Sequence, residues 1–223
     1  MNWFLKFLSS SIGRKLLMAL TGLFIILFLV VHLVGNLQLL HNDGGRAFNE
    51  YATFMVNFGP IKVVSYVNYA LILLHIIVAI WLGSQNRNAR SEGYAITNSA
   101  STWSSRNMGI LGTLILLFLV FHMSGFWWKM HNGPINEVTY DGKTINDLYA
   151  VVNEAYQLWW YVIIYVVSMA ILAFHLWHGF TSSFQTLGVN HPKYSPIINF
   201  IGKGFAIVVP FLFAVIPVVM YFK

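Results

Sequence analysis

The sequence predicts an all-α, polytopic membrane protein in which five transmembrane helices form one bundle over residues 1–223. Two observations support this fold class. Only 9% of the 223 residues are charged and 57% are hydrophobic, whereas soluble domains carry about 25% charged residues. The chain also contains five apolar segments of about 20 residues or more, the length that crosses a bilayer. A soluble domain is therefore not expected, either as the whole chain or as part of it.

The five apolar segments are separated by connections that hold nearly all the charged residues. They cover residues 16–40, 63–83, 108–128, 158–180 and about 201–222. The last contains Pro210 and Pro217, which predict a kink. Residues 1–15 lack the pattern of a cleaved signal peptide. With Trp3, Lys6 and Phe7, they favour a short helix in the membrane interface.

The distribution of charge predicts the orientation of the chain. With the N-terminus inside, the inner segments hold eight basic residues and one acid, whereas the outer segments hold five basic residues and six acids. Positive residues favour the cytoplasmic side, so we expect a cytoplasmic N-terminus and an external C-terminus. The net charge of +6 does not predict nucleic-acid binding, because the basic residues flank the apolar segments and do not cluster.

An internal repeat relates the first and third segments. Residues 26–42 (ILFLVVHLVGNLQLLHN) align with residues 116–132 (LLFLVFHMSGFWWKMHN) at an offset of 90 residues. His32 aligns with His122, and Gly35 aligns with Gly125. The second and fourth segments align weakly at an offset of 100. The sequence therefore predicts two helix-pair units of the same orientation plus a fifth helix.

Four histidines lie inside four separate apolar segments, where polar side chains are costly and usually functional. From the inner ends of their segments, His32 and His122 lie about 24 and 21 Å deep, at 1.5 Å per residue. His75 and His175 lie about 12 and 8 Å deep on the same scale. Matched depths predict an outer pair, His32 with His122, and an inner pair, His75 with His175.

Two histidines at one depth on different helices are what a haem with two axial imidazoles requires. The chain has no cysteine and no Asp or Glu inside a segment, which argues against iron–sulfur, zinc and di-iron centres. Gly35 and Gly125 share a helix face with their histidines and leave room for a flat macrocycle, although packing between helices explains one such glycine as well. His178 competes with His175 and is expected to contact a propionate or a headgroup.

The sequence resembles the cytochrome b subunit of succinate:quinone oxidoreductases. The similarity is to the single-chain, five-helix, di-haem type, most closely the b558 version of Bacteroidetes-like bacteria. It covers essentially the whole chain and is carried by TGL at 21–23 before His32, by single histidines in the second and third segments, and by HLWHGF (175–180) running into FQTLGVNHPKY (184–194). Some di-haem relatives carry a glutamate where this chain has Ala173.

The resemblance implies two haems b whose iron ligands are His32, His75, His122 and His175, and transfer of electrons to or from menaquinone. It implies as partners a flavoprotein subunit and an iron–sulfur subunit at the cytoplasmic face of a bacterial inner membrane. It is compatible with a dimer of heterotrimers. Glu50 is the closest match to the acid that the family places near its outer quinone site, although a solvated loop carboxylate is equally expected there.

Basic residues near the segment ends are candidates for binding haem propionates, although each also fits a role in topology. The inner candidates are Arg14, Lys15, Arg87, Arg106 and Lys193, and the outer one is Lys129. His41 and His131 are candidates for proton exchange near the outer surface. The alternative functions are the di-haem anchor of another respiratory enzyme, such as a hydrogenase or formate dehydrogenase, and a transporter with histidines along its path.

Overall fold

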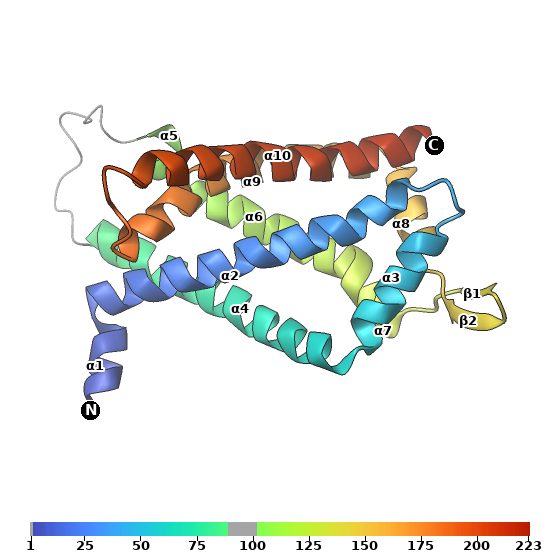
Figure 1. The fold of residues 1–223 in the computed structure, drawn as a ribbon, viewed down its shortest axis with the longest axis horizontal. Coiled ribbons are helices and arrows are strands. Elements are labelled where there is room, and N and C mark those ends of the chain that lie inside the picture. The colour runs from blue at the N-terminus through green and yellow to red at the C-terminus, as the bar shows by residue number, and fades with distance from the viewer. Residues whose placement is uncertain (1, 89–101) are drawn as a thin grey trace.

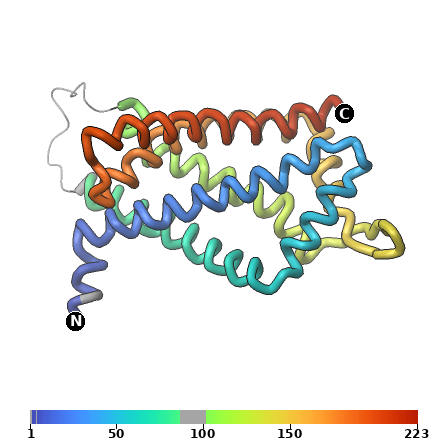
Figure 2. Tube along the Cα trace, in the orientation of Figure 1, coloured from blue at the N-terminus to red at the C-terminus, as the bar shows by residue number. Residues whose placement is uncertain are grey.

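A computed structural model describes residues 2–88 and 102–223 of the protein, and it confirms the all-α, five-span architecture. The five long apolar helices run alternately up and down, so the two termini lie at opposite ends of the bundle (Figures 1 and 2). One end carries the N-terminus and is called here the N-terminal end. The other carries the C-terminus and a β-hairpin and is called the hairpin end. By the predicted orientation these are the inner and outer ends.

The N-terminal half begins with a short helix, α1 (Trp3–Ser9), which lies across the start of the first span (Figure 1). The first span is α2 (Ser11–Leu37), extended by the 3₁₀ turn η1 (Gln38–Leu40). Ser10 caps α2 by accepting a hydrogen bond from the Gly13 N–H. A shorter amphipathic helix, α3 (Arg46–Asn57), crosses the hairpin end before the second span, α4 (Gly59–Asn88).

The third span has three parts, α6 (Met108–His122), the π-helix η2 (Met123–Trp127) and α7 (Trp128–Asn132), and follows the short α5 (Trp103–Arg106). The fourth span is α9 (Trp159–Thr186). The fifth span is α10 (Ser195–Phe222), which continues through Pro210 and Pro217 as one helix. Both prolines are almost fully buried. The spans extend beyond the predicted apolar segments because their ends carry polar residues into the interface.

The connection between the third and fourth spans is folded, which the sequence analysis did not predict. Strands β1 (Glu137–Tyr140) and β2 (Lys143–Asn146) form an antiparallel hairpin, and α8 (Leu148–Tyr156) follows it. Asp141 and Gly142 form its two-residue turn with φ of 50° and 79°, the left-handed values that an Asp-Gly hairpin turn takes.

Two groups of buried side chains hold the bundle together. The larger lies toward the hairpin end and joins Leu33, Tyr156, Tyr165 and Ile216 with their neighbours. The smaller joins Ile26, Leu176, Phe180 and Ala206. α10 packs along α9 and also against α2, whereas much of the outward-facing surface is apolar. Exposed apolar side chains on every span are expected where the solvent is lipid.

Candidate functional site

The four histidines of the spans lie in two couples within the bundle. His32 of α2 faces His122, the last residue of α6, with ring centres 5.8 Å apart and planes at 88°. His75 of α4 faces His175 of α9, with ring centres 6.5 Å apart and planes at 68°. The structure thus brings together the same two pairs that matched depth predicts, each pair made by two different helices.

Of the two spacings, 6.5 Å matches two imidazoles that bind one metal ion from opposite sides, and 5.8 Å is slightly shorter than that. A metal–imidazole bond is about 2 Å long, and a ring nitrogen lies roughly 1.2 Å from the centre of its ring. The centres of two such rings are therefore about 6.4 Å apart. Edge-to-face packing of rings covers about 4.5–7 Å as well. A metal also requires a ring nitrogen with a free lone pair, which depends on the hydrogen bonds that each ring makes.

The hydroxyl of Thr21 engages one ring nitrogen of His75. Thr21 Oγ1 donates its single proton to the carbonyl of Leu17 at 2.7 Å, and it lies 2.9 Å from His75 Nδ1. With its proton used, the hydroxyl can only accept from the ring. His75 Nδ1 therefore carries the proton, which leaves Nε2 with a free lone pair, the form that binds a metal. Thr21 is buried, so water does not compete for this bond.

Tyr165 makes the corresponding contact at the other couple. Its hydroxyl lies 3.0 Å from His122 Nδ1. The ring of Tyr165 stacks on Tyr161 with centres 5.2 Å apart and is surrounded by further aromatic rings, including Phe118 and Phe126. This packing fixes the position of the hydroxyl and, through it, the orientation of the His122 ring.

A π-helix begins immediately after His122 and covers Met123–Trp127. π-Helical turns are rare and occur frequently at functional sites, because the extra residue changes the direction of the side chains that follow. The repeat partner of this segment after His32 continues as α-helix and ends in a 3₁₀ turn. The two halves of the sequence repeat therefore differ in backbone just beyond the two histidines.

The ring nitrogens of His175 and His32 have weaker hydrogen-bond partners or none among the described residues. The buried Nδ1 of His175 has no hydrogen-bond partner among the described residues. Asn36 Nδ2 lies 3.5 Å from both ring nitrogens of His32 and donates a shorter bond, 2.8 Å, to the His32 carbonyl. His178 lies one turn beyond His175 toward the N-terminal end, and the ring that faces His75 is that of His175.

The two repeat-related glycines lie against tyrosines. A Cβ at Gly35 would collide with the ring of Tyr51 on α3, and a Cβ at Gly125 would collide with the hydroxyl of Tyr161. Both glycines therefore allow an aromatic side chain to approach the helix backbone. That they also make room for a macrocycle stays a prediction.

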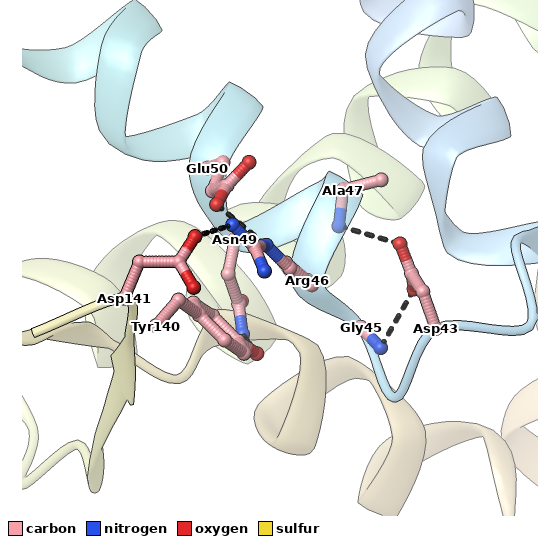
Figure 3. Close-up of polar contacts among 8 residues, drawn as sticks. All are labelled: Asp43, Gly45, Arg46, Ala47, Asn49, Glu50, Tyr140 and Asp141. Atoms are coloured by element: carbon pink, nitrogen blue, oxygen red, sulfur yellow. Dashed lines mark hydrogen bonds and ion pairs between the residues drawn. The ribbon is translucent and has the colours of Figure 1, made fainter. Parts of the chain in front are cut away.

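Glu50 lies on α3 at the hairpin end and is exposed (Figure 3). Its carboxylate binds Arg46 Nε at 2.8 Å, and the same guanidinium binds Asp141 in the hairpin turn. These two carboxylates raise the pKa of Arg46 above its ordinary value. Glu50 also lines an open pocket together with Phe54, Phe58, Tyr140 and Lys143.

Beneath this ion pair, Asn49 is fully buried and joins α3 to the hairpin and to α8. Its amide nitrogen donates to Asp147 Oδ1 at 2.9 Å and to the Tyr140 hydroxyl at 3.3 Å, and its oxygen accepts from the Tyr149 N–H at 2.8 Å. A buried amide with all these bonds made holds the segments in one register. Asn49 is a structural residue that the sequence analysis missed.

The remaining candidates lie at the ends of the bundle. The His41 carbonyl accepts a hydrogen bond from Lys223 Nζ, and the His131 ring stacks on Trp127 with centres 4.4 Å apart. Lys15, Arg106, Lys129 and Lys193 are exposed, whereas Arg14 is buried. The side chain of Arg87 lies outside the described part of the structure.

Comparisons of the chain with protein-family models, with curated proteins and with solved structures find no match. Within residues 2–88 and 102–223, no group of three or more histidine, aspartate or glutamate side chains is arranged to hold a metal ion. A haem with two axial histidines needs only two protein ligands. Each couple supplies two histidines, the number of protein ligands that such a haem requires.

Proposed function

We propose that this chain is the membrane-anchor cytochrome b subunit of a succinate:quinone oxidoreductase. In this proposal it carries two haems b and connects an iron–sulfur subunit, bound with a flavoprotein at the cytoplasmic face, to menaquinone in a bacterial inner membrane. Dicarboxylate chemistry would belong to the partner subunits. The observation that carries the proposal is the pairing of four histidines from four spans into two couples with metal-compatible spacing.

The side chains have distinct tasks in this proposal. His32 and His122 would hold the outer haem and His75 and His175 the inner one. When bound, these groups supply one-electron carriers at two depths of the membrane. Thr21 fixes the tautomer of His75 through the bond described above. A ligand held in one tautomer is pre-oriented for its metal.

Reduction of a quinone also consumes protons, so a group near the membrane surface must exchange them with water. Glu50 is our candidate because its carboxylate is exposed beside an open pocket at the hairpin end. In the proposed orientation this end is external. Protons taken up or released there would equilibrate with the outside.

The test is the visible spectrum of the purified chain. We expect two haems b per chain, and we expect His32→Ala or His122→Ala to remove one and His75→Ala or His175→Ala to remove the other. His41→Ala and His131→Ala are matched controls, because both residues are exposed, and these variants should keep both haems. A colourless chain, or equal loss in the controls, would refute the cytochrome.

A second measurement separates this enzyme from other respiratory complexes that use a di-haem anchor. The intact complex is purified through the chain, and its soluble subunits are identified. Succinate-dependent reduction of menaquinone by that complex supports the proposal. Recovery of hydrogenase or formate dehydrogenase subunits instead would assign the chain to the alternative complex.

A further inference from the structure

Arg14, in the first turn of α2, is a buried cation with an unused donor. The residue is 6% exposed, and its Nε donates to the Ser10 carbonyl at 3.2 Å. Its Nη1 is shielded from solvent and has no hydrogen-bond partner among the described residues. A guanidinium keeps its charge in proteins, so burial leaves a full positive charge with an unsatisfied N–H group.

Among the residues that the structure describes, the neighbours of Arg14 do not neutralise this charge. Trp81 of α4 stacks on the guanidinium, with its ring centre 4.5 Å from Cζ. Such stacking engages the face of the guanidinium, whereas the N–H donors lie in its plane. A buried charge without a partner is strongly unfavourable. The arrangement therefore indicates an anion that approaches in the guanidinium plane.

The chain offers almost no acid that could be this anion. Six of the seven acidic residues lie in the segments 43–50 and 137–154, at the hairpin end. The seventh, Glu92, lies outside the described residues. Both ion pairs in the described part of the chain involve Arg46, at the opposite end of the bundle from Arg14.

The class of this anion follows from how close Arg14 lies to the couple of His75 and His175, called here the inner couple. Arg14 precedes Thr21, the hydrogen-bond partner of His75, by seven residues, and Trp81 follows His75 by six. α2 and α4 are antiparallel and in contact, so both offsets point to the N-terminal end. At 1.5 Å per residue, Arg14 and Trp81 lie about 10 Å beyond the inner couple.

We infer that Arg14 binds a carboxylate of the inner haem, one of its propionates, and that Trp81 holds the guanidinium in place for it. This inference rests on the proposed function. A phospholipid phosphate has the same charge, but the adjacent Lys15 is exposed and Arg14 is shielded. A headgroup would therefore meet Lys15, whereas a group inside the bundle meets Arg14.

The test is the redox equilibrium of each haem in the holo-protein, with the two haems assigned through the His75→Ala and His122→Ala variants. In Arg14→Gln, we expect the ratio of reduced to oxidised inner haem at a fixed ambient potential to fall about tenfold, the effect of one charge at about 10 Å in a medium of dielectric near 25. The outer haem should be unchanged. Arg14→Lys keeps the charge and should restore most of the ratio.

Lys15→Gln is the matched control, because it removes the same charge from the neighbouring, exposed position, and it should change neither haem. Glu92→Gln removes a negative charge, so a rise in the inner-haem ratio as large as the fall in Arg14→Gln would show that the partner is Glu92 and would overturn the inference. Loss of bound phospholipid with both haems unchanged would assign the anion to lipid and would also overturn it. A haem-free wild-type chain would instead refute the proposed function.

A second arm leaves the chain intact, in case Arg14→Gln does not fold. The wild-type chain is reconstituted with haem b and with its dimethyl ester, in which the propionates carry no charge. The ester should bind less tightly at the inner couple. In Arg14→Lys, the inner couple should still bind haem b more tightly than its ester. Equal affinity of the inner couple for haem b and for the ester in the wild-type chain would overturn the inference.

Discussion

At the scale of single residues, the hydrogen bonds of the histidines carry more information than the spacing of their rings. Ring couples at 5.8 and 6.5 Å occur both around metals and in ordinary aromatic packing. The bond from His75 Nδ1 to Thr21 selects the tautomer that leaves Nε2 free. The Tyr165 hydroxyl contacts His122 Nδ1 at 3.0 Å and orients that ring, with either group able to be the donor. Neither Thr21 nor Tyr165 could be assigned a partner from the sequence.

A first prediction concerns Thr21. Thr21→Val keeps the shape of the side chain but removes the acceptor for His75 Nδ1–H, and loss of such a partner typically weakens metal binding 10- to 100-fold. We expect the inner haem to dissociate at least tenfold more readily from the purified chain, with the outer haem retained, as followed by absorbance during haem transfer to an acceptor protein.

Thr113→Val is the matched control for this measurement. Thr113 also donates its hydroxyl proton to a backbone carbonyl of its own helix, that of Gly109, at 2.9 Å. Removing the Thr113 hydroxyl tests the general effect of losing such a hydrogen bond within a span. Equal haem loss in the two variants would contradict a specific role for Thr21.

At the scale of elements, α3 is the helix that organises the hairpin end. It begins after Gly45, whose φ of 89° places it in the left-handed region, and a side chain there would collide with the ring of Tyr149. Only glycine combines that backbone with that close approach. Through Arg46, Glu50 and Asn49, α3 then holds the hairpin (Figure 3).

A second prediction concerns the start of α3. The Asp43 carboxylate accepts from the Gly45 N–H at 3.0 Å and from the Ala47 N–H at 2.8 Å. Desolvation acts in the opposite direction, but these backbone donors hold the pKa of Asp43 below its ordinary value. A carboxyl with a lowered pKa in the folded state stabilises that state above its unfolded pKa of about 3.9, and the contribution is lost as pH falls through the lowered value.

We therefore expect Asp43→Ala to accelerate hydrogen exchange of the first amides of α3 about threefold at pH 7, a modest effect because the carboxylate is exposed. The difference from the wild type, corrected for intrinsic exchange, should vanish below the lowered pKa. Asn42→Ala, which leaves both bonds of Asp43 in place, is the control. A difference that persists in strong acid would rule out the carboxylate as its source.

At the scale of the whole molecule, the couples join the two halves of the sequence repeat. Each couple takes one histidine from the first unit and one from the second, α2 with α6 and α4 with α9. Bringing two similar units together thus creates two similar histidine couples. The odd number of spans, with α10 as the fifth, then puts the termini on opposite faces.

A third prediction tests the orientation of the bundle in the membrane. The chain has no cysteine, so a single introduced cysteine is the only thiol of the chain that a maleimide can label. Glu137→Cys at the hairpin and Lys193→Cys at the N-terminal end both replace exposed residues. A membrane-impermeant maleimide should label position 137 in intact cells and position 193 only after permeabilisation. The reverse pattern would contradict a cytoplasmic N-terminus and the proposed side for the iron–sulfur subunit.

The sequence by itself determined the five spans and the position of each histidine along its span. Both follow from the number and order of residues within one helix and need no knowledge of its neighbours. The Asp-Gly turn between residues 137 and 146 was also readable, since turn chemistry is local. The hairpin was missed because the connection between the third and fourth segments was considered only for its charge.

The tertiary structure alone decided which side chains meet around the histidines. Contacts such as Thr21 with His75, Tyr165 with His122 and Trp81 with Arg14 join helices that are distant in sequence. They depend on how each helix is rotated about its axis, and a nearly uniform apolar surface does not encode that rotation. The burial of Arg14, with Lys15 beside it exposed, follows from the same rotation. Helix packing sets it, because only packing distinguishes one face of such a helix from another.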